Sequence, residues 1–433
     1  MPPSLPPLPT PLQTPLQSFR PLFHATTWRV FLCVLTGLLT GHTTLACVRA
    51  SLLCATVSWQ QCCDFFRRAR WSRSAFLAAT TALVLRALYP GGLPARLWWV
   101  VDTTTSDKPS ARKVFGIRTF WRGCRRPGQL RTHQGHGWLL LAHLYQRADG
   151  SWQAVLVGAL LWLQLRCAPP SRLTSVLVAQ LQLPPQVCHV VVSDRGLNGC
   201  QGVRWLRAQN CHSLTRLKRN TVVYTPAEVP AVRGRGRPRT YGTQYRVDAL
   251  DPSLLTEGAV TVWVDGRWQP ATTWRGTFWR KRLPEQVTLV IVETAGRAPW
   301  YLQATDPTLT TAEIVAGYHG RHAIEPAIQA ANALGLDRYH GRTARGVRRW
   351  PLLICLAHSL LGLLALGALH PHAGTRPLPT LGWPWYRQED TVGQLRRRLL
   401  AALAQAGIFV PEGGLGHPMP KIMPVRPAGE RAA

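Results

Sequence analysis

The chain has 433 residues, of which 46% are hydrophobic and 18 are tryptophans, so a wholly disordered protein is excluded and about two or three domains are possible. Its 51 Lys and Arg residues against 20 Asp and Glu residues give a formal net charge of +31. The basic residues are spread over most of the chain, which favours a protein that lies along a polyanion such as nucleic acid. An arginine-biased composition is the alternative explanation of the same excess. We find no secretion signal and expect a cytoplasmic protein.

The first part of the chain divides into a leader and a helical region. Residues 1–26 are rich in proline and lack hydrophobic periodicity, so we expect a disordered leader. Residues 27–92 show helical spacing of apolar side chains among several arginines and end at Pro90-Gly91-Gly92. We predict an all-helical, basic DNA-binding domain here. A helical pack with a solvated arginine face is the alternative.

Two hydrophobic strands in residues 93–213 are each followed by a carboxylate. Leu97–Val101 precedes Asp102, and Val187–Ser193 precedes Asp194. Two further strands and a helix lie between them, and a helix follows, which is the order of a ribonuclease H-like sheet. Because buried central strands are normally apolar throughout, we favour a functional role for both aspartates over a simple turn.

Residues 214–299 have short alternating segments separated by turns, which predict a β-rich insertion. Within it, Arg235 and Arg237 belong to an R-G-R-P sequence that is thin enough to enter an A·T-rich minor groove. A flexible basic loop that touches phosphates is the simpler interpretation. Both interpretations place these arginines at a nucleic-acid backbone.

A helix near residue 310 carries the third candidate carboxylate. Thr310 and Glu313 have the spacing of a capping box, which predicts the start of the helix. Tyr318, Arg321 and Glu325 then recur on one face of that helix. A tyrosine, an arginine and a carboxylate on one face suit a phosphate and a metal ion better than an apolar core.

Residues 300–370 complete the predicted core, and 371–433 are expected to form a C-terminal helical segment and tail. Trp350–Leu369 is apolar and about as long as a bilayer requires. We favour a buried core helix, with a transmembrane helix as the alternative.

Asp102, Asp194 and Glu325 could be brought together by two strand ends and one helix face. Carboxylate oxygens suit Mg²⁺ or Mn²⁺. Two such ions would activate water or a DNA 3′-hydroxyl for in-line displacement at phosphorus. Glycoside hydrolysis by two carboxylates is the alternative chemistry, but it leaves the net charge of +31 without a purpose.

The cysteines do not predict a zinc site. The eleven cysteines include no C-x-x-C pair, and Cys211-His212 has no convincing second half. We expect reduced thiols that act as small hydrophobic side chains.

These residues resemble the DDE transposases of bacterial insertion sequences, in the group with a Y-x2-R-x3-E-x6-K signature. Here the signature reads Tyr318, Arg321 and Glu325, with Asn332 in place of the lysine. The Val-Val-Asp-Thr-Thr segment at Asp102 and the Val-Ser-Asp-Arg-Gly segment at Asp194 are also similar to the family. The combination is far more specific than any one segment.

The resemblance implies an α/β fold, with a ribonuclease H-like mixed sheet, flanking helices and a β-rich insertion between the second aspartate and the glutamate. It also implies cut-and-paste strand cleavage and transfer at terminal inverted repeats by a homodimer on double-stranded transposon ends and target DNA, without a membrane. Tyr318 and Arg321 are implied to hold the DNA backbone. Asn332 leaves open a subgroup variation or a catalytically inactive DNA-binding derivative.

Overall fold

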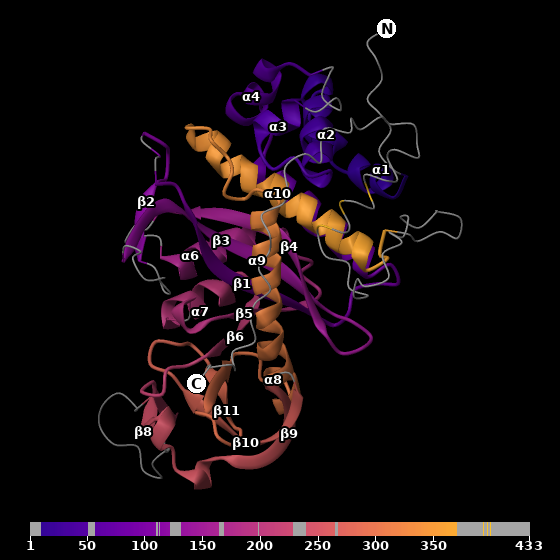
Figure 1. Cartoon of the computed structure of the whole chain (residues 1–433). Helices are drawn as coiled ribbons and strands as arrows, with labels where there is room; N and C mark the ends of the chain where they lie inside the picture. The colour runs from indigo at the N-terminus through magenta and orange to yellow at the C-terminus, as the bar shows by residue number, and fades with distance from the viewer. Residues whose placement is uncertain are drawn as a thin grey trace, which may run out of the picture.

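The computed structural model has a mixed α/β fold, with one large mixed sheet and flanking helices (Figure 1). This architecture is consistent with the ribonuclease H-like fold predicted from the sequence. The structure describes residues 10–50, 57–109, 111, 113–121, 131–163, 169–197, 199–227, 240–264 and 267–369, and positions 393, 396 and 399.

Five strands form the part of the sheet that carries the candidate site. β1 (Arg96–Asp107) lies between β3 (Thr132–Gln146), which is antiparallel to it, and β5 (Cys188–Ser193), which is parallel to it. β4 (Trp152–Trp162) pairs antiparallel with β3, and β6 (Cys211–Arg216) pairs parallel with β5. The long buried runs of β3 and β5 explain their place, because strands covered on both faces are apolar along their length. Helices α6 (Pro170–Gln180) and α7 (Cys200–Arg207) flank this part of the sheet.

Two details of these strands differ from the sequence prediction. We expected the first strand to end at Asp102, but β1 continues to Asp107 because β3 stays paired with it, from Leu140 opposite Asp102 to Gly135 opposite Asp107. The strand β6 was not predicted. Its polar residues hide the strand pattern in the sequence, yet they are mostly buried between β5 and β12 (Trp300–Ala304), the last strand in chain order.

The sheet continues into the region predicted to be a β-rich insertion. β6 pairs with β12 (Trp300–Ala304), and β11, β10, β7 and β8 follow outward, with β9 paired to β10. These strands lie at the opposite end of the molecule from the N-terminal helices (Figure 1). Their bounds are Val222–Pro226 (β7), Tyr241–Arg246 (β8), Thr256–Val264 (β9), Arg267–Trp279 (β10) and Gln286–Glu293 (β11), while β2 (Arg118–Trp121) closes the other edge of the sheet.

The N-terminal segment departs from the predicted disordered leader. Thr10–Gln17 forms helix α1, and Leu12, Leu16 and Phe19 are almost completely buried. These side chains recur at i, i+4 and i+7, so they lie on one helix face despite the surrounding prolines. Residues 1–9 of the predicted leader lie outside the described residues.

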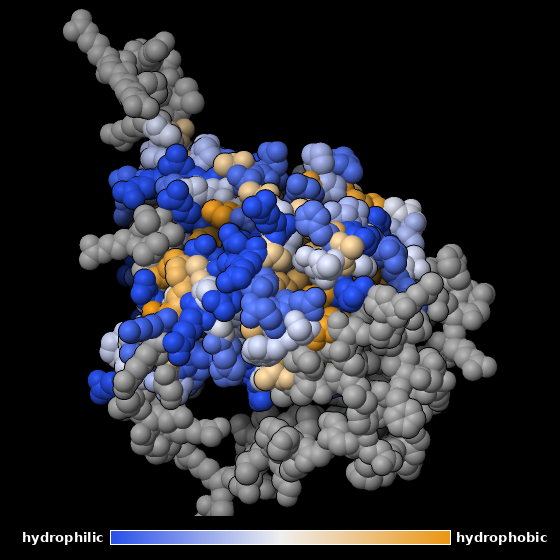
Figure 2. Space-filling model, turned by 90° about the horizontal axis from the view of Figure 1, so that it is seen from above, coloured by the Kyte–Doolittle hydropathy of each residue, from blue (hydrophilic) through white to orange (hydrophobic). Residues whose placement is uncertain are grey.

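The N-terminal helices share the core of the sheet, although the sequence suggested a separate domain. Their buried side chains belong to the same hydrophobic cluster as those of β1, β3 and β4. Helix α10 (Ala344–Ala365) runs between these helices and the sheet (Figure 1). From above, hydrophilic side chains dominate the described surface (Figure 2). The helices that complete this end are Ala25–Leu39 (α2), Leu45–Ala50 (α3), Trp59–Arg67 (α4) and Arg73–Leu88 (α5).

Helix α10 contains the apolar run for which we favoured a buried core helix over a membrane span. Among the described residues, α10 is the one helix that is long and apolar enough to cross a membrane. However, 89% of its apolar stretch is buried inside the protein. The burial agrees with the core-helix prediction.

Arg349 joins α10 to the N-terminal helices. Its residue is 3% exposed, and its guanidinium donates hydrogen bonds to the backbone carbonyls of Phe65, Ala69 and Trp71 at 3.0, 2.7 and 3.0 Å. The same group lies 4.3 Å from the centre of the Trp71 ring. Burial lowers the pKa of Arg349 to about 10, so the side chain stays charged at neutral pH. One buried cation therefore satisfies several carbonyls at the junction of two chain segments.

We expect Arg349→Met to lower the free energy of unfolding by about 3 kcal/mol or more, because several buried carbonyl groups lose their donor. Chemical denaturation of the two proteins measures this loss. Arg338→Met, at an exposed position, is the matched control and should change stability by less than about 0.5 kcal/mol. Equal stability of wild type and Arg349→Met would contradict the anchoring role.

Candidate active site

The pairing of β1 with β5 sets two of the predicted carboxylates side by side. The last pair in this parallel register is Val101 with Ser193. Asp102 and Asp194 each follow directly, so they lie at the same level on neighbouring chain segments, whose backbones are about 4.8 Å apart in a sheet. The two aspartates that the sequence singled out are therefore brought together.

The third carboxylate is carried by the predicted helix, which the structure divides into two. Helix α8 (Thr311–Gly320) begins with the predicted capping box of Thr310 and Glu313, which is confirmed. A 3₁₀ turn (Arg321–Ala323) then separates α8 from α9 (Ile324–Ala333). Pro326 gives a physical reason for the division, because it has no N–H to continue the helical hydrogen bonds. Glu325 lies in the first turn of α9.

Close packing holds this helical segment on the sheet. A Cβ atom added at Gly317 would lie 2.4 Å from the ring of Trp98 on β1, and one at Gly320 would lie 2.8 Å from the ring of Trp152 on β4. Both glycines thus permit an approach that any larger residue would prevent. The approach brings the turn after α8 to Asp102.

Arg321 joins two of the carboxylates. Its Nη1 lies 3.3 Å from Asp102 Oδ2, and its Nη2 lies 3.2 Å from Glu325 Oε1. The neighbouring His322 Nδ1 is 3.4 Å from the same oxygen of Glu325. The sequence suggested Arg321 as a DNA contact, and in the structure its guanidinium pairs with the carboxylates of Asp102 and Glu325.

The electrostatics of Asp102 show that the three carboxylates act on one another. Burial raises the pKa of Asp102, and the negative charges of Asp194 and Glu325 raise it further. The Thr103 N–H, which donates to Asp102 Oδ1 at 2.7 Å, and the charge of Arg321 oppose this rise. Asp102 is half-buried, Asp194 and Glu325 are exposed, and Arg321 contacts two of the three carboxylates. The oxygen ligands of this group fit a divalent cation such as Mg²⁺ or Mn²⁺.

Tyr318 lies inside the protein beside this group. The residue is buried, its ring packs edge-on against Trp300, and burial raises the pKa of its hydroxyl. Arg321 and Asp194 are among its charged neighbours. The predicted contact of Tyr318 with DNA stays a prediction.

Two predicted DNA contacts and the signature position Asn332 complete the predicted set. Arg235 and Arg237 fall within residues 228–239, which lie outside the described residues. Asn332, at the position of the signature lysine, is half-buried near the end of α9.

Sequence reasoning missed a row of aromatic side chains next to the site. Trp263 and Trp268, on the β9–β10 hairpin, are 41% and 64% exposed, and their rings are 5.4 Å apart. The Trp268 ring lies 6.4 Å from His319, whose ring is 6.0 Å from that of His322, the partner of Glu325. The two tryptophans on either side of a hairpin turn were the sequence feature that could have indicated this surface. Exposed aromatic faces of this kind can stack on nucleobases.

Comparison with known protein families decides the class of this chain. A family model described as DDE superfamily endonuclease matches residues 18–284, more than half of the 433 residues. The chain belongs to this family. Membership indicates an enzyme of the nuclease or transposase type with DNA as its substrate, and DDE enzymes generally use divalent metal ions. No curated protein matches the chain.

The matched region of this DDE endonuclease contains Asp102 and Asp194 but ends before Glu325. The place of Glu325 in the site therefore rests on its ion pair with Arg321 and its electrostatic effect on Asp102.

We expect Asp102→Asn to raise the melting temperature of the metal-free protein at neutral pH. The pKa of Asp102 is raised by folding, so the stability linked to its protonated form is present below the ordinary pKa of about 3.9 and is lost as pH rises through the higher folded value. The gain from Asn should therefore shrink as the pH is lowered toward 4. Melting curves with a chelator across this pH range measure it.

The control is Asp149→Asn. Hydrogen bonds from Ser151 lower the pKa of exposed Asp149, so its substitution should not stabilise the protein at neutral pH. An Asp102→Asn protein that is less stable than wild type by the same amount at every pH would contradict the assigned repulsion.

Proposed function

We propose that this DDE endonuclease is a transposase that cleaves and transfers the strands of an insertion sequence at its terminal inverted repeats. The observation that carries the proposal is geometric: the β1–β5 register sets Asp102 beside Asp194, and Arg321 links Asp102 to Glu325, in a strongly basic chain. The strand order β4-β3-β1-β5-β6, with β1, β5 and β6 parallel, supports a ribonuclease H-like core around that site.

Each part of the site has a distinct role in the proposed reaction. Asp102, Asp194 and Glu325 would hold two Mg²⁺ or Mn²⁺ ions, which supply activation of the attacking oxygen and stabilisation of the leaving oxygen at phosphorus. Arg321, once released from Asp102 and Glu325, presents a planar fork of donors that matches a phosphate. Tyr318 would contact the DNA backbone near the cut, together with Arg321.

Contacts with DNA would extend beyond the carboxylates. The exposed rings of Trp263 and Trp268 offer stacking surfaces for bases near the cut. Arg235 and Arg237 would contact the backbone or a narrow minor groove. The N-terminal helices would bind the element ends, and the active complex would be a homodimer on DNA in the bacterial cytoplasm.

A catalytically inactive DNA-binding derivative is the second candidate. The observation that favours it is Asn332, which replaces the lysine of the signature and removes a positive charge from α9. Such a protein would keep the fold and the DNA contacts and lack strand cleavage.

The decisive experiment is Mg²⁺-dependent cleavage of DNA that carries the element's own ends. We expect Asp194→Asn and Glu325→Gln each to lower the cleavage rate at least about a hundredfold, because each removes a carboxylate that the proposed metal site requires. DNA affinity should be retained, as measured by fluorescence anisotropy. Glu257→Gln, which changes an exposed carboxylate on β9, is the control and should cleave normally.

The outcomes separate the two candidates. Full cleavage by Asp194→Asn would exclude the assigned carboxylate site. A wild-type protein that binds these ends but does not cleave them would favour the inactive derivative.

We also expect Trp268→Ala to weaken binding to single-stranded or frayed element ends by about fivefold to a hundredfold, the range for loss of one stacked base. Trp121→Ala is the matched control, because Trp121 is 75% exposed but lies on β2, at the other edge of the sheet. Equal affinities of both variants, measured by anisotropy, would remove Trp268 from the DNA surface.

A further inference from the structure

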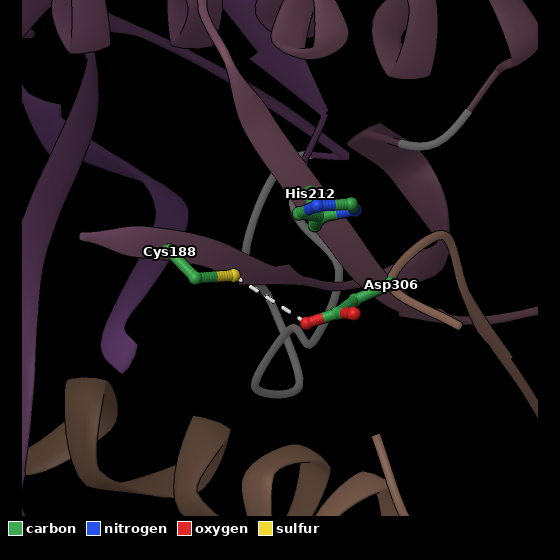
Figure 3. Close-up of side chains that lie close together, drawn as sticks. All are labelled: Cys188, His212 and Asp306. Carbon is green, nitrogen blue, oxygen red and sulfur yellow. Dashed lines mark hydrogen bonds between the residues drawn. The ribbon is translucent and has the colours of Figure 1, made fainter. Parts of the chain in front are cut away.

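Three possible metal ligands meet at an end of the sheet that the candidate active site does not use. Cys188 begins β5, His212 is the second residue of β6, and Asp306 follows β12. In the part of the chain that the structure describes, one ligand atom from each lies within 4.8 Å of the others. Figure 3 shows the side chains of Cys188 and Asp306 pointing toward each other, with His212 nearby.

This cluster is separate from the candidate active site. Cys188 and Asp194 lie at opposite ends of β5, and six residues of extended strand span roughly 20 Å. The parallel strands β5 and β6 both begin at this end, and the antiparallel β12 ends there. The three ligands therefore come from the starts of β5 and β6 and from the segment that follows β12.

The spacing of two ligands already suits zinc. Cys188 Sγ lies 3.4 Å from Asp306 Oδ2. A tetrahedral zinc ion with Zn–S of about 2.3 Å and Zn–O of about 2.0 Å would hold these atoms about 3.5 Å apart. The His212 nitrogen lies within 4.8 Å of both atoms and would move closer to complete the set.

The groups around the ligands hold them in place. Asp306 Oδ1 accepts hydrogen bonds from the backbone N–H and the hydroxyl of Thr308 at 3.0 and 2.6 Å, which leaves Oδ2 directed at Cys188. Arg96 Nε lies 3.3 Å from that same oxygen. Such outer contacts orient the ligands of metal sites.

His212 is in the protonation state that a metal needs. Its Nε2 lies 3.2 Å from Arg207 Nη1, and because a guanidinium only donates, this nitrogen accepts and the ring is neutral. Its Nδ1 lies 3.5 Å from the Thr305 hydroxyl. One of these contacts would give way to the metal while the other fixes the ring.

The side chains around the three ligands carry a net negative charge that a divalent cation would neutralise. The carboxylates of Asp306, Glu285 and Glu313 face the guanidinium groups of Arg96 and Arg207, so one negative charge is in excess. Loss of the Cys188 proton on metal binding would make the excess two, which matches Zn²⁺.

We propose that Cys188, His212 and Asp306 form a zinc site, with a water molecule as fourth ligand. Sulfur and imidazole ligands select zinc over Mg²⁺. Because Asp306 precedes the capping box of α8, zinc would tie the starts of β5 and β6 to the segment that leads to Glu325. The site would be separate from the carboxylates, and its water would leave one coordination position open.

The test is the metal content and cobalt spectrum of the full-length protein. We expect about one zinc per chain in wild type after dialysis, and at least a tenfold loss in Cys188→Ser. Co²⁺ should give a thiolate charge-transfer absorption in wild type that Cys188→Ser abolishes. Cys200→Ser, a half-buried cysteine at the start of α7, is the matched control and should keep both signals.

A second variant keeps the proposal testable if Cys188→Ser does not fold. His212→Gln should retain the thiolate absorption in altered form and bind zinc at least tenfold more weakly. Absence of both signals in wild type, or equal signals in wild type and Cys188→Ser, would overturn the site and leave a hydrogen-bonded thiol. The carboxylates of the candidate active site contain no sulfur, so loss of DNA cleavage and loss of this absorption are distinguishable.

Discussion

The parallel register of β1 and β5 is the constraint on which the candidate active site depends. It sets Val101 beside Ser193 and thereby brings Asp102 and Asp194 to the same level. A slip of one residue would turn one carboxylate to the opposite face of the sheet. Both strands are apolar up to this point and lie in the main hydrophobic cluster, so burial of these runs fixes the register. The hydrophobic core therefore determines where the chemistry can occur.

The helical side of the site depends on the same core. Gly317 allows α8 to touch the Trp98 ring on β1, and this contact brings Arg321 and Glu325 to Asp102. The site lowers the stability of the fold, because burial and neighbouring carboxylates disfavour the ionised form of Asp102. The protein offsets that cost with Arg321 and with an extensive core that also includes the N-terminal helices. Stability and site geometry thus come from shared packing.

The sequence allowed prediction of the features that have local causes. The two apolar strands before Asp102 and Asp194 and the capping box of α8 were recognisable because period and spacing reveal them. The helix at Thr10–Gln17 was missed because its prolines obscure the spacing of Leu12 and Leu16. The strand β6 was missed because its neighbours in the sheet, and not an apolar pattern, stabilise it. Likewise, Cys188 and Asp306 are 118 residues apart, so only the sheet order reveals that they meet.

Arg321 links metal binding at the carboxylates to the proposed recognition of DNA. Its guanidinium contacts oxygens of Asp102 and Glu325 that a divalent cation would also use. A metal and this arginine therefore compete, because the same lone pairs cannot serve both fully. A phosphate that draws Arg321 away would expose those oxygens to the metal, and by linkage metal binding would in turn favour the phosphate. Under the proposed function, this competition delays assembly of the reactive site until DNA is in place.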